Sequence, residues 1–168
     1  VAANFLEPLV NAFLANGELG IVSPQIQYYD APGRIQYAGC NGINPFTMRG
    51  STRGYGEVDN GKYDRQEPTE LAHGAAMMIR RDVFSQIGLL APDFFIYYEE
   101  FDFCSRAREL GWEINYVPGP PVLHKESITV GKNSVLKTYF MTRNRIMYLR
   151  RNIQGLKGGV ALLYVTFI

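Results

Sequence analysis

Apolar positions in the first third of the chain recur with spacings that predict one helix followed by extended segments. Residues 4–16 place a stripe of apolar side chains on one helical face, with Asn4 as the expected N-cap and Gly17 as the stop. The apolar run at 19–24 predicts a short buried strand. Apolar and polar residues then alternate over 25–48 around Pro-Gly and Asn-Gly pairs, which predicts a hairpin.

The rest of the chain continues the alternation of helices and strands. A polar, glycine-bearing stretch at 49–70 has no period and predicts a loop. The later expected elements are a buried strand at 75–79, a helix at 81–87 closed by Gly88, a helix at 98–110 closed by Gly111, strands at 112–117 and 121–124, and a long helix at 133–153. This order predicts an α/β fold that forms one compact unit or part of one.

Composition and charge narrow the class of protein. The 168 residues are 46% hydrophobic and 20% charged, which is typical of a packed globular protein. A net charge of +1 and the lack of a long basic run give no reason to expect nucleic-acid binding. The two cysteines, Cys40 and Cys104, lie far apart, so we expect a reducing compartment rather than a disulfide framework, with Cys104 packed among apolar residues of a helix.

The two ends of the sequence lack the features of a natural start and stop. The sequence begins VAANFLEPLV, with neither an initiator Met nor a signal-peptide core, and ends GGVALLYVTFI inside an apolar run. That run is shorter than the roughly 20 apolar residues of a membrane-spanning helix. We expect a chain cut at both ends, whose last run is either the start of a membrane-associated helix or a truncated core helix.

Three features resemble known ligand sites but lack essential residues. Residues 56–62 (GEVDNGK) match half of a phosphate-binding loop, but Tyr63 stands where Ser or Thr is needed, and the loop's own carboxylates would repel phosphate. Residues 59–67 lack the ligand spacing and the closing Glu of a calcium loop. His73 and His124 are far apart and have no E-x-x-H partner, so a hydrolytic zinc site is not expected.

The most informative segment is FFIYYEEFDFCSRARELG, in which adjacent carboxylates open the helix at 98–110. The helix dipole favours Glu99 and Glu100 in a first turn, and we expect it to keep both ionised near neutral pH. An ionised carboxylate at the mouth of a cleft is suited to accept a proton from an attacking hydroxyl, whereas acidic first turns are also common without any function. Asp102 and Arg106, four residues apart, are expected to pair along one face.

The run from Gly74 to 127, GAAMMIRRDVFSQIGLLAPDFFIYYEEFDFCSRARELGWEINYVPGPPVLHKES, resembles the second half of family-2 inverting glycosyltransferases, especially rhamnosyltransferase-like members. In that family a Gly-Ala strand and an Arg-rich helix precede the pattern F-x-Y-x-E-D-x-D-x-x-x-R and a strand that ends in His. A later helix carries Tyr and Arg-Asn, matched here by Tyr139, Arg143 and Asn144.

The resemblance implies a fold and an organisation. The fold is the C-terminal, acceptor-side part of a GT-A nucleotide-diphospho-sugar transferase, an α/β fold with a mixed sheet flanked by helices. Residues 1–155 would form this part of a single domain, and 156–168 a truncated apolar segment.

The resemblance also implies a site and a reaction. The implied site residues are Glu100 as general base with Glu99 beside it, Gly74, Ala75, Asp102, Arg143 and Asn144 at the acceptor or diphosphate, and His124 at a metal. The reaction would transfer a sugar, with inversion, from a nucleotide-sugar to a hydroxyl of a glycan or glycolipid acceptor, such as a surface polysaccharide precursor. A divalent metal, Mg²⁺ or Mn²⁺, would neutralise the leaving group.

Several departures limit what the resemblance carries over. The family's Glu-Asp pair is Glu99-Glu100 here, the turn at 89–93 lacks the usual Phe-Asp pair, and the chain contains no D-x-D. We therefore expect the donor site and the main metal carboxylates to be missing, so that the isolated chain is inactive. A cytoplasmic location, with peripheral contact to the inner face of a membrane left open, is expected, as is self-association through an exposed sheet edge. The alternative is a non-catalytic carbohydrate-binding or assembly domain with the same fold.

Overall fold

The computed structural model describes residues 1–44, 49–125, 131, 134–153 and 155–167. Its elements, in chain order, are α1 (Leu6–Ala15), β1 (Leu19–Tyr28), β2 (Ile35–Tyr37), β3 (Cys40–Ile43), β4 (Gly50–Thr52), β5 (Glu67–Pro68), β6 (Met78–Ile79), α2 (Arg81–Ile87), the 3₁₀ turn η1 (Pro92–Phe94), α3 (Glu99–Glu109), β7 (Glu113–His124), α4 (Val135–Asn152) and α5 (Gly155–Phe167). Residues 45–48 of the expected hairpin and 133 of the expected long helix lie outside the described residues.

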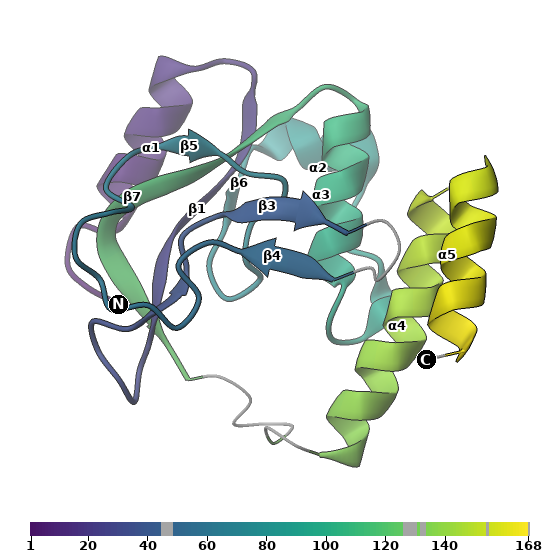
Figure 1. The fold of residues 1–168 in the computed structure, drawn as a ribbon. Helices are drawn as coiled ribbons and strands as arrows, with labels where there is room; N and C mark the ends of the chain where they lie inside the picture. Colours follow the sequence, from purple (N-terminus) through teal and green to yellow (C-terminus); the bar gives the residue numbers. More distant parts are fainter. Residues whose placement is uncertain (45–48, 126–130, 132–133, 154, 168) are drawn as a thin grey trace.

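A mixed sheet built around β1 and β7 forms the centre of the molecule (Figure 1). The strand order is β2-β1-β7-β5, with β6 paired to β1 on the side of β2. β1 and β7 run parallel, whereas the other pairs in this sheet are antiparallel. β3 and β4 form a separate antiparallel ribbon. The predicted mixed sheet flanked by helices is confirmed.

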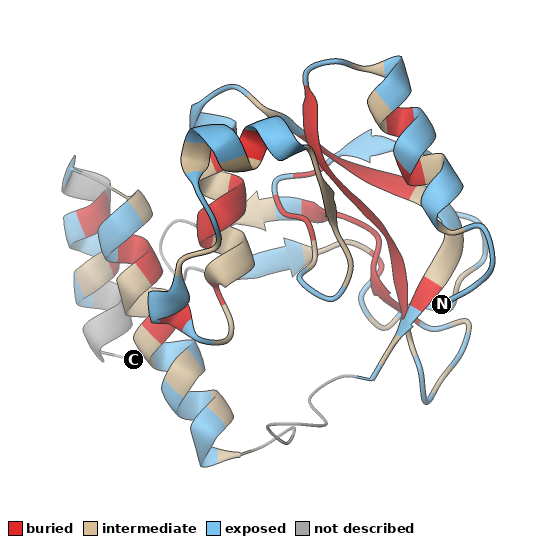
Figure 2. Cartoon of the chain, turned by 180° about the vertical axis from the view of Figure 1, so that it is seen from behind, coloured by how far each residue is buried: buried red, intermediate tan, exposed pale blue. Residues whose placement is uncertain are grey.

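Helices cover both faces of the sheet; between them β1 is buried along almost its whole length, and β7 is buried at residues 114–117 and at Val122 (Figure 2). Leu9 of α1 packs with Val22 on one face, while Val83 of α2 and Phe103 of α3 pack with Ile21 on the other. Adjacent residues of β1 thus supply the two cores, as the alternation of a strand requires.

α4 and α5 lie side by side beyond α3, away from the sheet (Figure 1). The carboxylate of Asp102, only 1% exposed, joins α3 to α4. It accepts hydrogen bonds from Arg106 Nε at 2.8 Å, Arg151 Nε at 3.0 Å and Asn152 Nδ2 at 3.1 Å. The predicted pair of Asp102 and Arg106 is confirmed. Among the described residues, no helix is long and apolar enough to cross a membrane.

Several details differ from the sequence prediction. The strands expected at 112–117 and 121–124 are one strand, because residues 118–121 bulge out between the pairs Pro24–Val117 and Ile26–Val122. The strand expected at 75–79 is reduced to β6 and is only half buried, since the preceding residues form a tight turn. α1 begins at Leu6, after Asn4 has adopted a positive φ of 59°, so Asn4 is not the N-cap. Both cysteines are buried and free, and the predicted packing of Cys104 in the core is confirmed.

Candidate functional site

A strained turn delivers the two glutamates to the start of α3. Phe95, Tyr97 and Tyr98 have φ values of 64°, 67° and 72°, in the left-handed region that side chains with a Cβ avoid. Each such residue costs on the order of 1–3 kcal/mol and persists only where the surroundings enforce it. Glu99 and Glu100 follow directly, so the turn fixes where their carboxylates point.

Asn144 of α4 holds this turn in its strained conformation. Its fully buried amide Nδ2 lies 2.8, 2.7 and 2.8 Å from the carbonyl oxygens of Phe94, Ile96 and Tyr97. Arg143 donates from Nε to Asn144 Oδ1 at 2.9 Å, which orients the amide with its N–H groups toward the turn. The Nη2 group of Arg143 also donates to the carbonyls of Asp93 and Phe94. Arg143 and Asn144 therefore hold the turn before α3 in place through its carbonyl groups.

Burial dominates the electrostatics of the glutamate pair. Oε2 of Glu99 and Oε2 of Glu100 are buried and have no hydrogen-bond partner among the described residues. Burial, together with the neighbouring charge of Glu99, raises the pKa of Glu100 to about 8, and burial also raises the pKa of Glu99. The expectation that the helix dipole keeps both ionised is wrong for Glu100, because desolvation outweighs the dipole. Orphaned carboxylate oxygens of this kind are characteristic of a site that meets a ligand.

The Gly-Ala segment lies against this pair. A Cβ at Gly74 would be 3.6 Å from Cδ of Glu100, so the Gly74 backbone lies close to this carboxylate. Buried Ser23 holds this turn by donating to the carbonyl of Ala76 at 2.7 Å and accepting from His73 N at 3.2 Å. Gly74 and Glu100, 26 residues apart in sequence, are thereby brought together.

Two histidines, His73 and His124, contact each other near the Gly-Ala turn. The rings of His73 and His124 meet edge to face with centroids 5.8 Å apart. Ala75 N donates to Nδ1 of His73 at 3.0 Å, and desolvation lowers the pKa of His73 to about 4, so this ring is neutral with its proton on Nε2. His124 Nδ1 lies 2.9 Å from Oε1 of Gln36, an acceptor, which leaves the Nε2 lone pair of His124 available to a metal.

These residues do not by themselves form a metal site. Within the described part of the chain, no three His, Cys, Asp or Glu side chains converge as ligands. His124 fits the role of one ligand.

A cleft of about 730 Å³ opens beside Glu100, between β4, α3 and α4. Its lining combines aromatic and apolar side chains with hydroxyl and basic groups: Arg49, Gly50, Thr52, Tyr97, Tyr98, Glu100, Phe101, Lys137, Thr138, Met141, Thr142 and Arg145. Glu100 contributes the carboxylate in this set. The cleft is large enough for a sugar and its immediate attachment.

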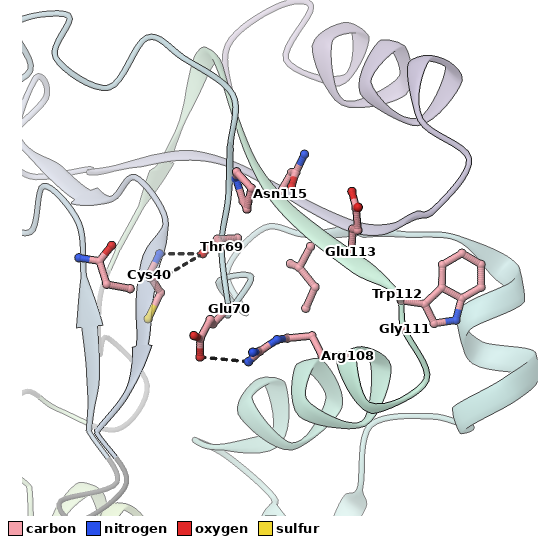
Figure 3. A pocket seen from close by; sticks show the side chains of 11 residues that line it. Cys40, Thr69, Glu70, Arg108, Gly111, Trp112, Glu113 and Asn115 are labelled. Atoms are coloured by element: carbon pink, nitrogen blue, oxygen red, sulfur yellow. Dashed lines mark hydrogen bonds and ion pairs between the residues drawn. The ribbon is translucent and has the colours of Figure 1, made fainter.

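A second hollow of about 580 Å³ lies at the opposite end of α3 (Figure 3). Glu70 and Arg108 face each other across it and pair at 3.0 Å, and the Thr69 hydroxyl accepts from Cys40 N at 2.7 Å. Glu70 and Arg108 neutralise each other, and the third charged residue of this hollow, Glu113, accepts a hydrogen bond from Asn16 Nδ2 at 2.8 Å. Because the unpartnered glutamate pair lies elsewhere, we place the candidate site at the cleft beside Glu100.

The predicted site residues thus differ in their relation to the cleft. Glu100, with Gly74 against it, borders the cleft. Arg143 and Asn144 hold the turn instead of lining the cleft, and both oxygens of Asp102 are used internally. Lys137 and Arg145, two basic residues of the cleft, were not predicted as site residues, although their eight-residue spacing, with Met141 midway, places all three on one face of α4.

Comparisons of sequence connect this geometry to known proteins. The low-salt glycan biosynthesis hexosyltransferase Agl10 of Haloferax volcanii is 38% identical over 88 residues, which are 52% of this chain and 29% of that protein. The N-acetylglucosaminyl-diphospho-decaprenol L-rhamnosyltransferase of Mycobacterium tuberculosis is 32% identical over 76 residues, which are 43% of this chain and 25% of that protein. The matches thus span less than a third of these relatives' length. No family model matches the chain.

A comparison of folds gives the class. The crystal structure of GalNAc-T7 with UDP, GalNAc and Mn²⁺ superposes with a TM-score of 0.51 at 18% identity, over 98% of this chain and 36% of that one. The chain therefore has the α/β fold of a GT-A glycosyltransferase. Its relatives in sequence are glycosyltransferases as well, so the predicted resemblance to family-2, rhamnosyltransferase-like enzymes is confirmed.

Proposed function

We propose that this chain is the acceptor-side part of an inverting glycosyltransferase in which Glu100 is the general base. The observation that carries the proposal is the buried glutamate pair, with its unpartnered oxygens, beside a cleft of about 730 Å³ on a GT-A fold. The sugar-transferring relatives support the reaction class.

The proposed step is a single displacement. An acceptor hydroxyl gives its proton to Glu100 as its oxygen bonds to the anomeric carbon of the donor sugar, and a nucleoside diphosphate leaves from the opposite face. Because burial raises the pKa of Glu100, its ionised form is a stronger base than an ordinary glutamate. Glu99 contributes the neighbouring charge that raises this pKa further.

The other predicted residues take distinct parts in this proposal. Gly74 and Ala75 leave room for the acceptor beside Glu100, and His124 offers one ligand to a divalent metal, which would stabilise the leaving diphosphate. Arg143 and Asn144 act as positioning residues for the turn. Asp102 has no part in ligand binding here, because its carboxylate is occupied by internal partners.

The donor site and the main metal carboxylates are proposed to lie outside residues 1–168, so the isolated chain should transfer nothing. Four further points stay predictions: the division between residues 1–155 and 156–168, the cytoplasmic location, the contact with a membrane and self-association.

The test is an assay of the longest natural chain that contains these residues. A panel of nucleotide-sugars is incubated with Mg²⁺ or Mn²⁺, nucleoside diphosphate release is measured, and the anomeric configuration of the product is read by NMR. Metal-dependent release with an inverted product supports the proposal. A retained configuration refutes inversion, and a folded protein that binds glycans but releases nothing from any donor favours the non-catalytic binding domain.

A further inference from the structure

Three hollows follow one another along α3, from the cleft beside Glu100 to the hollow at the far end of the helix. Between these two lies a third hollow of about 330 Å³. Phe101 lines both the cleft and the middle hollow, and Glu70 and Arg108 line both the middle hollow and the far one. Neighbouring hollows thus meet at shared side chains, and together they make one groove along the helix.

The groove runs between α3 and the β3–β4 ribbon. Phe101, Ser105 and Arg108 are spaced by four and three residues, which places them on one face of α3. Residues of the ribbon line all three hollows opposite this face. A Cβ at Gly50 would lie only 3.3 Å from the ring of Phe101, so the ribbon and the helix approach each other closely where the cleft meets the middle hollow.

The middle hollow offers hydroxyl groups with unused hydrogen-bonding capacity. The hydroxyl oxygens of Ser105 and Tyr148, which both line it, lie 2.8 Å apart. One hydroxyl donates to the other, so the pair keeps one proton and several lone pairs for a ligand.

The far hollow adds a carboxylate, a guanidinium group and an amide (Figure 3). Glu70 and Arg108 pair through Oε2 and Nη1, which leaves Oε1 of Glu70 and the other guanidinium N–H groups without a partner among the described residues. Asn115 is only 8% exposed, and its buried Oδ1 has no hydrogen-bond partner in the same part of the chain. A buried polar atom left unpaired costs free energy unless a ligand or water satisfies it.

These groups suit a neutral ligand that carries many hydroxyl groups. Carboxylate, guanidinium and amide groups each present two or more hydrogen-bonding atoms in a plane, which matches neighbouring hydroxyls on a sugar ring. Because Glu70 and Arg108 neutralise each other and Glu113 adds a negative charge, the far hollow does not favour a phosphate. From Glu100 to Arg108 the helix rises about 12 Å, and the far hollow extends beyond, so the groove has room for roughly three linked sugars.

We propose that this groove binds an acceptor oligosaccharide of roughly three sugar units, with its reacting hydroxyl beside Glu100 and its far sugar against Glu70, Arg108 and Asn115. The proposal rests on the proposed function, because the role of Glu100 as base decides which end of the groove takes the reacting sugar. The far hollow would then select the acceptor by its length and its neutral character.

Titrations followed by ¹H–¹⁵N NMR test the proposal on the 168-residue chain without requiring transfer. The probes are neutral malto-, cello- and chito-oligosaccharides, from the monosaccharide to the tetrasaccharide, and a serine-rich peptide of similar length. The variants are Arg108→Gln and the matched control Arg81→Gln, an exposed arginine of α2 that lines none of the three hollows. Circular dichroism confirms that each variant is folded, and Glu70→Gln takes over the test if Arg108→Gln is not.

We expect at least one series to gain about tenfold or more in affinity from the monosaccharide to the trisaccharide and then to level off. The trisaccharide should shift the amide signals of Ser105, Arg108 and Asn115. Arg108→Gln should weaken its binding by about fivefold to tenfold, as for the loss of one hydrogen-bonding group, and Arg81→Gln by less than about twofold.

Three results overturn the proposal: affinity that does not rise with length in any series, signal shifts confined to the cleft, or equal losses in Arg108→Gln and Arg81→Gln. A serine-rich peptide that binds at the same residues more tightly assigns the groove to a polypeptide and overturns it too. Failure of the proposed function is seen separately. If Glu100→Gln in the longest natural chain transfers sugar at the wild-type rate, Glu100 is not the base, whatever the groove binds.

Discussion

Replacing Asn144 with Ala should destabilise the protein far more than the loss of one surface amide. The side chain is fully buried, and its two amide protons serve carbonyl groups of the strained turn at distances of 2.7–2.8 Å. Two buried hydrogen bonds whose acceptors lose their partner are worth about 2–4 kcal/mol together. Alanine returns roughly 0.6 kcal/mol of helix propensity, so we expect a net loss of about 2–3 kcal/mol.

The assay is urea-induced unfolding, followed by the fluorescence of Trp112 and by circular dichroism. Asn11→Ala is the matched control, because Asn11 is exposed on α1 and reports the helix propensity alone. Once the turn relaxes, Glu100 should also meet more water, and its pKa should fall toward the ordinary value. If Asn144→Ala unfolds at the same urea concentration as Asn11→Ala, the argument that this amide enforces the turn is wrong.

The remaining predictions concern the two carboxylate sites and Gly74. Asp102→Asn should lower the free energy of unfolding by about 2–4 kcal/mol in urea titrations, while the folded fraction of the longest natural chain keeps its rate of sugar transfer; unchanged stability with lost transfer would restore Asp102 as a binding residue. Because the folded pKa of Glu100, about 8, lies above its unfolded value, the folded state holds the extra proton, and stability should fall as pH rises from 6.5 to 8.5. His73, whose pKa falls on folding from 6.5 to about 4, gives a slope of the opposite sign that fades above pH 6.5. Glu100→Gln should therefore flatten the slope at the upper end of this window, and an unchanged slope there would contradict the assignment. Gly74→Ala should fold normally but lower transfer at least about tenfold in initial-rate assays, since its methyl group would fill the space beside Glu100; full activity would show that the acceptor approaches from elsewhere.

Local sequence signals predicted the helices and the acidic pair well. α2 has the predicted bounds, 81–87, because Gly88 ends the apolar period where its positive φ is needed. The pairing of Asp102 with Arg106 follows from helix geometry alone, and the structure contains it.

Features that depend on tertiary contacts could not be read from the sequence. The raised pKa of Glu100 reflects desolvation by segments distant in the chain, which no first-turn rule includes. From the sequence alone, Asn144 could equally lie on the exposed face of its helix or be buried. Only the packing of α4 against the turn shows that its amide bonds to the turn's carbonyls. The continuity of β7 across its prolines depends on the irregular pairing with β1.

The most direct test of the central claim is the initial rate of sugar transfer by Glu100→Gln in the longest natural chain that contains residues 1–168. Glu109→Gln, an exposed glutamate at the other end of α3, is the matched control. The account predicts a fall of about 10²- to 10⁴-fold for Glu100→Gln at saturating donor, with donor affinity and the control rate unchanged. A Glu100→Gln enzyme that transfers sugar at the wild-type rate would contradict it.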